Sequence, residues 1–227
     1  MDLMLRLEEK LKEWGASLVG FSNVREKLAP ALNKYPYAVS VGVRLSDAII
    51  DEITDKPTFT YFHHYRTVNA LIDQITLRGM LFIQESGFKA LAVPASQTVN
   101  DAEDAHFGLF QHKTAAVMAG LGWIGRSGLF ISRLYGPRIR LGTLLTNMPV
   151  ASAGETVQQN CGDCRLCVQS CPAMALTGNC WEAGCDRSRL VDVNACSNYM
   201  TSRFKHIGRG AVCGICVRVC PWGAKNR

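Results

Sequence analysis

The chain has 227 residues, of which 48% are hydrophobic and 19% charged, and its formal net charge is +6 at pH 7. This composition is ordinary for a globular protein, and the length allows one or two domains. No apolar run approaches the roughly 18 residues that a membrane-spanning helix needs, so we expect no membrane span. The basic residues are scattered without a Lys/Arg run, which predicts no nucleic-acid partner.

Apolar residues in the first part of the chain recur at helical and strand spacing. The pattern predicts helices over residues 3–14, 61–86 and 111–119 and strands over residues 18–21, 37–43 and 88–93. We expect two further strands, 129–131 and 139–145, to pair as a hairpin around Tyr135-Gly136-Pro137. The alternation of helices and strands indicates an α+β protein that begins with an α/β domain.

A change in composition marks a predicted domain boundary. Between Pro149 and Gln159 the apolar, strand-like segments give way to small and polar residues, and the cysteines begin directly afterwards at Cys161. We therefore predict an α/β cofactor or substrate domain over residues 1–155 and a cysteine-rich domain over residues 156–227.

Ten cysteines lie in the predicted second domain, and the first four form a compact array. Cys161, Cys164, Cys167 and Cys171 are spaced C-x2-C-x2-C-x3-C and are followed by proline. Three thiolates on one tight loop can bind three corners of a [4Fe–4S] cluster. In two-cluster ferredoxins the fourth cysteine binds the other cluster. The spacing therefore predicts iron–sulfur clusters.

The second array has one cysteine fewer. Cys213, Cys216 and Cys220 supply three thiolates, so a fourth must come from upstream, and Cys196 is the obvious donor. We predict two [4Fe–4S] clusters with interleaved ligands. One is assigned to Cys161, Cys164, Cys167 and Cys220, and the other to Cys171, Cys196, Cys213 and Cys216.

Zinc and disulfides are the alternatives for these cysteines. Structural zinc favours two separated pairs of ligands, which the arrays do not supply. Disulfides need an oxidising compartment, yet the start of the chain, Met1 to Arg6, has no signal-peptide pattern. We therefore expect a cytoplasmic, reducing and anaerobic setting. Cys180 and Cys185 remain, as free thiols or as a redox pair or substitute ligand.

A glycine-rich segment lies between the predicted helix 111–119 and the strand 129–131. Its glycines allow the backbone to approach a cofactor closely, but they also fit a helix end followed by a bend. The segment follows a helix and does not open one, which argues against a Rossmann nucleotide loop. The candidate cofactor-binding residues are Gly120, Gly122, Trp123, Gly125 and Arg126.

Together, the segment from Lys113 to Arg126, the segment from Leu129 to Pro149, both cysteine arrays and Cys196–Thr201 resemble epoxyqueuosine reductases. Reductive dehalogenases are more distant relatives. The resemblance implies a nitroreductase-like α/β domain, a ferredoxin-like two-cluster domain and a base-off cobalamin held between them.

Two departures from that family bear on the substrate. The family's proton-donating aspartate lies in an Asp-Ser-x-Pro type segment, whereas Ala92–Thr98 contains no acid. The sequence up to Arg227 also lacks the C-terminal helical extension that helps the family hold tRNA. We therefore expect that the chain does not reduce epoxyqueuosine, and that it acts on another substrate or serves only to deliver electrons.

No catalytic residue can be assigned from the sequence. His63 and His64 could face a cofactor or act as acid–base groups, although a structural role is the default. A polar stretch could replace the missing aspartate, although a solvated loop is the simpler interpretation. Its residues are Asp101, Glu103, Asp104 and His106.

Two functions follow from these patterns. The first is an oxidoreductase that takes electrons from a low-potential ferredoxin or flavodoxin and passes them through two clusters to a corrinoid or small substrate. The second is an electron-relay protein with no corrinoid or substrate chemistry of its own.

Overall fold

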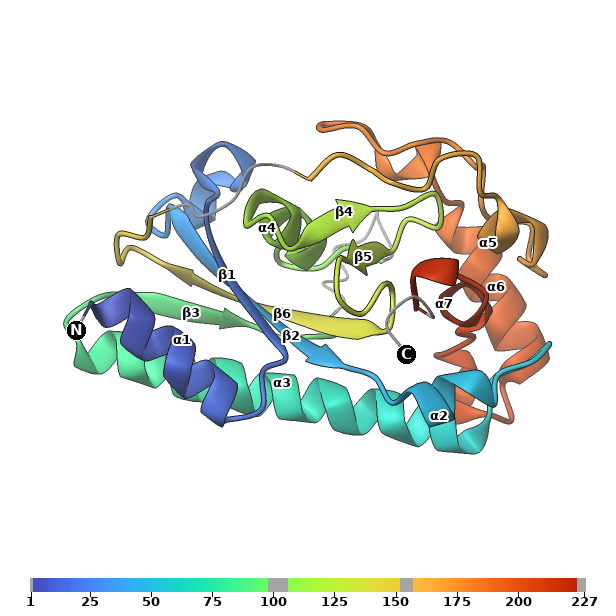
Figure 1. The fold of residues 1–227 in the computed structure, drawn as a ribbon, viewed down its shortest axis with the longest axis horizontal. Helices are drawn as coiled ribbons and strands as arrows, with labels where there is room; N and C mark the ends of the chain where they lie inside the picture. Colours follow the sequence, from blue (N-terminus) through green and yellow to red (C-terminus); the bar gives the residue numbers. More distant parts are fainter. Residues whose placement is uncertain (1, 98–105, 152–156, 224–227) are drawn as a thin grey trace. The chain divides into compact units, whose positions relative to one another are not determined.

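The computed structural model describes residues 2–97, 106–151 and 157–223 (Figure 1). The chain divides into two compact units, each assembled from three separate segments. The first unit comprises Met1–Val43, Val68–Leu121 and Arg140–Val157, and the second comprises Arg44–Thr67, Gly122–Ile139 and Gln158–Arg227. The predicted domains 1–155 and 156–227 stay a prediction, because compactness alone does not show which segments fold independently.

The described residues form helices and strands in an α+β arrangement, which confirms the predicted fold class. The α-helices are α1 (Leu3–Glu13), α2 (Asp47–Asp51), α3 (Phe59–Glu85), α4 (His112–Met118), α5 (Leu166–Gln169), α6 (Val193–Phe204) and α7 (Ile215–Arg218). The strands are β1 (Leu18–Asn23), β2 (Tyr37–Arg44), β3 (Ala90–Val93), β4 (Gly122–Ile124), β5 (Phe130–Ser132) and β6 (Ile139–Thr146).

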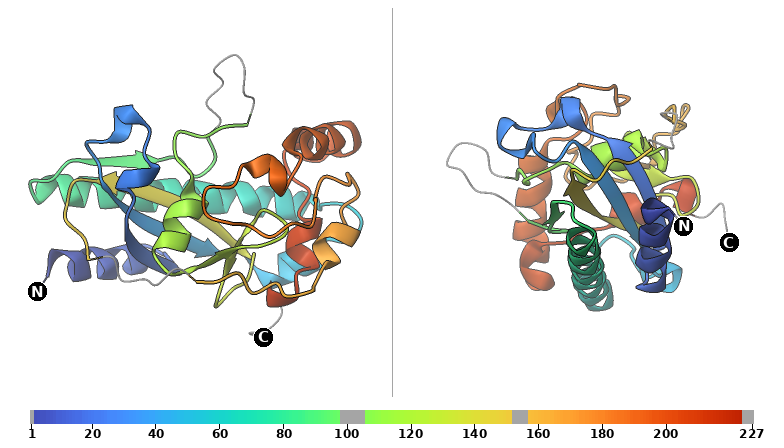
Figure 2. Two further views of the ribbon diagram at one scale, coloured as in Figure 1. Left: turned by 90° about the horizontal axis from the view of Figure 1, so that it is seen from above. Right: turned by 90° about the vertical axis from the view of Figure 1, so that its left-hand side faces the viewer.

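A four-stranded sheet of order β1-β2-β6-β3 organises the first unit. Strands β1 and β2 are antiparallel, with Leu18 opposite Gly42, and β3 and β6 are antiparallel, with Ala90 opposite Thr146. Helices α1 and α3 lie on one face and α4 lies on the other (Figure 2). The Ser22 hydroxyl of β1 fixes α4 by donating to the Ala115 carbonyl oxygen at 3.3 Å.

Apolar side chains are buried between this sheet and the helices α1 and α3. Gly79 of α3 faces the side chains of Leu11 and Leu144 at close range, which explains a glycine inside a long helix. Leu11, Ile72, Ile75 and Leu144 are at most 1% exposed. Burying a side chain of this size stabilises a fold by roughly 1.5–3 kcal/mol, so these residues carry much of the first unit's stability.

Strands β4 and β5 form a two-stranded antiparallel sheet in the second unit, with Trp123 opposite Ile131. The predicted hairpin between residues 129–131 and 139–145 is therefore wrong, because β5 pairs with β4 while β6 belongs to the four-stranded sheet. Strand β4 was not predicted because it begins at a glycine within the glycine-rich segment, and glycine weakens a strand pattern.

The remainder of the second unit consists of short helices and turns. The carboxylate of Asp192 starts α6 by accepting a hydrogen bond from the Ala195 backbone at 2.9 Å. Helices α5 and α7 have four residues each and lie within the two cysteine arrays. In the described part of the chain, no helix is both long and apolar enough to cross a membrane.

Candidate metal centre

Four cysteines from both arrays line one pocket in the second unit. The Cys164 backbone N–H donates to the Cys161 carbonyl oxygen at 3.1 Å, and this tight turn brings the first thiols of the array together. Cys220 follows α7, so it reaches the pocket from a distant part of the sequence. The lining residues are Gly125, Arg126, Ser127, Ile131, Cys161, Cys164, Cys167, Cys220, Pro221 and Trp222.

The remaining array cysteines form a second group. Burial raises the pKa of the Cys216 thiol strongly, and negative charge at Cys213, Cys196 and Cys171 acts in the same direction. Cys171 belongs to the first array by sequence, yet its charge also raises the pKa of Cys196 and Cys213. The structure therefore brings together the same two sets of four cysteines that the spacing predicts.

Buried thiols in both groups resist ionisation. Burial raises the pKa of Cys220 to about 11, and negative charge at Cys161 and Cys167 adds to the effect. A metal binds the thiolate, so loading such a site releases protons. The four thiols line a pocket. Among the described residues, no three His, Cys, Asp or Glu side chains are arranged to hold a single metal ion.

The pocket fits a [4Fe–4S] cluster by its donors and by its backbone. Four thiolates are the ligand set that such a cluster requires. A Cβ added to Gly125 would lie 3.3 Å from Cys161 Sγ and 3.0 Å from Ile131 Cγ1, so a side chain there would crowd the pocket. Cys161, Cys164, Cys167 and Cys220 could therefore hold a cluster beside the backbone of Gly125.

The other predicted cofactor-binding residues have structural surroundings. A Cβ on Gly122 would overlap the carbonyl oxygen of Ile131, so the pairing of β4 with β5 requires glycine there. Gly120 follows α4, and its N–H donates to Val117 at 2.9 Å. Trp123 is buried and packs edge-to-face on Trp222, with ring centroids 4.8 Å apart. Cofactor binding by these residues stays a prediction.

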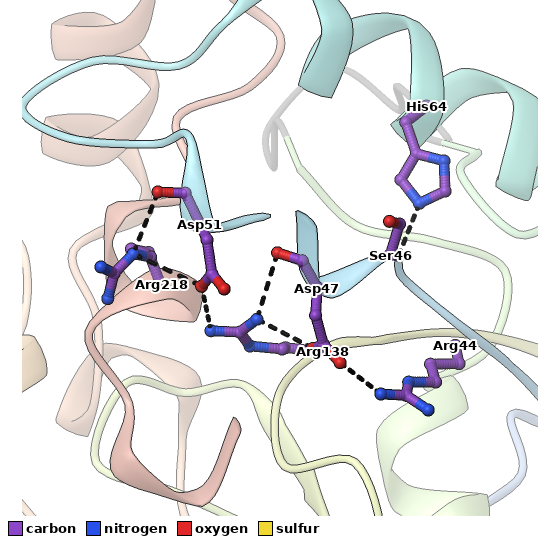
Figure 3. A network of polar contacts seen from close by, with 7 residues as sticks. All are labelled: Arg44, Ser46, Asp47, Asp51, His64, Arg138 and Arg218. Carbon is purple, nitrogen blue, oxygen red and sulfur yellow. Dashed lines mark hydrogen bonds and ion pairs between the residues drawn. The ribbon is translucent and has the colours of Figure 1, made fainter. Parts of the chain in front are cut away.

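An ion-pair network around the buried Arg138 adjoins the second cysteine array (Figure 3). Arg138 is 1% exposed and donates to Asp47 Oδ1 and Asp51 Oδ1, each at 2.8 Å. Arg218, between Cys216 and Cys220 in sequence, lies 3.7 Å from Asp51 Oδ1. The network therefore ties α2 to the segment that carries two of the candidate ligands.

The acidic member Asp47 reports the strength of this pairing. Burial by itself would raise the pKa of Asp47, but hydrogen bonds from Arg44 and Arg138 outweigh it and hold the pKa below its ordinary value. This network was not predicted, and its one signal in the sequence is a charged residue, Arg138, at the edge of an apolar segment.

His63 and His64, proposed from the sequence, are not among the residues that line the thiol pocket. His64 Nε2 accepts a hydrogen bond from the Ser46 backbone at 3.0 Å, and burial lowers its pKa (Figure 3). A neutral His64 thus supports the start of α2, and His63 precedes it on α3. His106 lies in a turn with a φ of 85°, whereas Asp101, Glu103 and Asp104 lie outside the described residues.

Of the two extra cysteines, Cys180 lies close to the first array. Its Sγ accepts a hydrogen bond from Gln159 Nε2 at 3.2 Å, and Gln159 Oε1 accepts one from the Cys161 backbone at 3.3 Å. Cys185 is half-buried in the turn after Glu182. The roles of both thiols stay a prediction.

Two titratable residues of the first unit escaped the sequence analysis. Asp73 of α3 accepts a hydrogen bond from the Ala95 backbone at 2.9 Å. His112 of α4 hydrogen-bonds the Thr143 hydroxyl at 2.8 Å and the Pro94 carbonyl oxygen at 3.0 Å. Burial lowers the pKa of His112 to about 4. A carboxylate and a neutral imidazole therefore lie beside the segment that lacks an acid of its own.

Comparison with known families identifies the cysteine-rich part of the chain. Residues 160–223 match the family described as a 4Fe-4S double cluster binding domain, and the match includes all eight cysteines assigned to the two clusters. Residues 160–223 are thus a double-cluster domain, which confirms the predicted pair of [4Fe–4S] clusters as cofactors.

Particular relatives are epoxyqueuosine reductases. The chain is 33% identical to that of Synechocystis sp. over 151 residues, which cover 60% of this chain and 49% of the relative. It is 32% identical to that of Staphylococcus aureus over 129 residues, or 53% of this chain and 30% of the relative. The chain therefore matches half or less of the length of these relatives.

Solved structures show the same fold at low sequence identity. The catabolic reductive dehalogenase NpRdhA, bound to 3-bromo-4-hydroxybenzoic acid, matches with a TM-score of 0.76 at 18% identity, over 97% of this chain and 32% of that one. Epoxyqueuosine reductase from Streptococcus thermophilus matches with a TM-score of 0.60 at 22% identity, over 99% and 67%. The predicted resemblance to both kinds of enzyme is confirmed.

The expectation that epoxyqueuosine reduction is excluded is wrong. Several relatives that are 32–34% identical carry the name epoxyqueuosine reductase. Ala92–Thr98 contains no acid, but an acid absent from one segment can come from another element. Asp73 of α3 contacts that segment at Ala95.

The expectation of no nucleic-acid partner is also wrong. One structural relative is an epoxyqueuosine reductase solved with an epoxyqueuosine-modified tRNA stem loop. The prediction was based on the absence of an uninterrupted basic run, but basic residues that are separated in sequence can also contact phosphates. Arg203, Lys205 and Arg209 are separated in sequence, but all three are exposed around the end of α6.

Proposed function

We propose that this chain is an iron–sulfur reductase that passes electrons through two [4Fe–4S] clusters to base-off cobalamin or a small substrate. The interleaving of the two cysteine arrays carries the proposal. Cys220 joins the group of the first array, and Cys171 joins the group of the second. Each array would therefore contribute to both clusters, which is the ligand pattern of two-cluster electron-transfer proteins.

The two groups of thiols also adjoin each other. Negative charge at Cys167, in the first group, contributes to the raised pKa of Cys216, in the second. Clusters bound there would supply one-electron transfer in short steps, and the protein would set their potentials through burial and hydrogen bonds. Trp222 lines the pocket of the first group.

The relatives suggest what receives the electrons. One structural neighbour is described as acting in B12-dependent dehalogenation, which supports a corrinoid as acceptor. The epoxyqueuosine reductases among the relatives make an epoxyqueuosine-containing tRNA the first substrate to test. The exposed Arg203, Lys205 and Arg209 would provide positive charge for such a substrate.

Anaerobic reconstitution with iron, sulfide and hydroxocobalamin tests the proposal. We expect about eight irons per chain, because two [4Fe–4S] clusters contain that number. Corrinoid binding and dithionite-driven turnover of epoxyqueuosine in a tRNA stem loop would support the reductase. Eight irons with neither corrinoid nor turnover of any tested substrate would favour an electron relay. Zinc in place of iron would overturn both.

A further inference from the structure

Arg126 occupies a special place at the pocket of Cys161, Cys164, Cys167 and Cys220. It follows Gly125 directly and lines the pocket with the four thiols. Its Nη2 donates to the Gly162 carbonyl oxygen at 2.8 Å, and its Nη1 donates to the Gly178 carbonyl oxygen. Two arms of the guanidinium are therefore fixed by loops of the cluster domain.

The third nitrogen of this side chain lacks a partner. Arg126 Nε is buried and makes no hydrogen bond to any described residue. A guanidinium is planar and always charged, so two fixed arms also fix the direction of the Nε–H bond. Leaving a buried charged donor unsatisfied is costly, and such an atom in a folded protein calls for an explanation.

A cluster bound in the pocket would supply an acceptor for this donor. Thiolate and sulfide sulfurs accept hydrogen bonds, and hydrogen bonds to sulfur tune the reduction potential of such clusters. Glycine at the preceding position leaves no side chain between this backbone and Cys161 Sγ. The loop can therefore present Arg126 directly to the cluster.

We propose that Arg126 donates its Nε–H to a sulfur of the cluster at Cys161, Cys164, Cys167 and Cys220 and thereby raises that cluster's reduction potential. Reduction adds one electron and no proton, so the cluster becomes more negative by one charge. A cationic donor stabilises the reduced state more than the oxidised state. Arg126 is thus a positioning and tuning residue, and the inference rests on the proposed two-cluster function.

A potentiometric EPR titration of the reconstituted protein tests the role of Arg126. We expect Arg126→Gln to retain its iron but to shift the reduction equilibrium of one cluster at least tenfold toward the oxidised form, or about 59 mV for a one-electron couple. Arg126→Lys keeps the charge but loses the Nε–H, so its potential should also fall, by less. Cys164→Ser identifies which EPR signal belongs to this cluster.

Arg165→Gln is the matched control, because Arg165 is an exposed arginine between Cys164 and Cys167. An unchanged potential in an iron-loaded Arg126→Gln protein would overturn the proposal. An equal shift in Arg165→Gln would overturn it too, since any nearby charge would then suffice.

A measurement on the unmutated protein covers the case in which the Arg126 variants fail to fold. Protein labelled with 15N-arginine should show a nitrogen hyperfine coupling to one reduced cluster, and absence of that coupling would contradict the hydrogen bond. Failure of the unmutated protein to bind iron would instead refute the proposed function, so the two failures are distinguishable.

Discussion

The two compact units are stabilised by different means. In the first, a four-stranded sheet buries aliphatic side chains such as Leu7, Leu11 and Leu144 beneath α1 and α3. The second contains all ten cysteines, a two-stranded sheet and an almost fully buried arginine, Arg138. Both units bury apolar side chains, and Ile50, Trp123 and Ile131 are at most 1% exposed in the second. The second unit adds ion pairs around Arg138 and, in our proposal, bound clusters.

The two sources of stability differ in what they require. Apolar burial is present in any solution that keeps the chain folded. Clustered, buried thiols instead stabilise a fold only when metal has displaced their protons. The sharpest experiments on this protein separate these two sources of stability.

Iron removal should have the largest effect and should be confined to the second unit. We expect amide hydrogens in residues 158–223 to exchange much faster after anaerobic chelation, because the loops would lose their ligand bonds. Amides of β1 and β2 should remain protected by the sheet. Hydrogen exchange measured by mass spectrometry checks this, and equal deprotection of both units would contradict the comparison.

Substitution of one ligand should remove about half of the iron. Cys216→Ser takes a buried thiolate from the second group, so one cluster should be lost and the other retained. Cys180→Ser is the control and should keep its full iron content. Iron analysis of both proteins decides, and an equal loss in Cys180→Ser would refute the ligand assignment.

Loss of the buried arginine should destabilise the second unit strongly. Arg138→Met removes two hydrogen bonds between charged groups, those to Asp47 and Asp51, and we expect the free energy of unfolding to fall by about 3 kcal/mol. Arg44, 45% exposed, also pairs with Asp47, and Arg44→Gln should cost less than about 1 kcal/mol. Denaturant unfolding measures both, and equal losses would argue against the role of burial.

A cavity in the first unit should lower stability without affecting iron. Leu144 is fully buried, so Leu144→Ala should cost about 3 kcal/mol through lost burial and the cavity that remains. The iron content of the reconstituted variant should match that of the unmutated protein. Loss of iron in parallel with stability would show that the units are not energetically separate.

Acidification should weaken the first unit modestly through His112. Its pKa is about 4 in the folded state against 6.5 ordinarily, so the unfolded state binds more protons below pH 6.5. The contribution of a neutral His112 to the free energy of unfolding is fully present above pH 6.5. It is lost as the pH falls toward 4, by at most about 1.4 kcal/mol per pH unit. Unfolding of His112→Gln at pH 7 and 5 should show a smaller pH dependence, and an unchanged one would exclude His112.

Much of the metal centre was predictable because thiols within short loops have little freedom. The steps between Cys161, Cys164 and Cys167 place them on one loop, and the two Cys-Pro endings indicated the exchange of Cys171 and Cys220. The structure gathers the cysteines in those groups, while iron ligation stays a prediction. Helices such as α1 and α3 were also predictable from the sequence, because the apolar periodicity that indicates a helix is a local pattern.

Tertiary structure alone decided the contacts between residues far apart in the chain. Strand β5 pairs with β4 and not with β6, Asp73 reaches Ala95 from α3, and Arg138 lies between two aspartates. Arg126, predicted only as one residue of a glycine-rich segment, turned out to line the four-thiol pocket. Local patterns constrain neighbouring residues, but distant partners are chosen only when the whole chain packs and buried polar groups find their bonds.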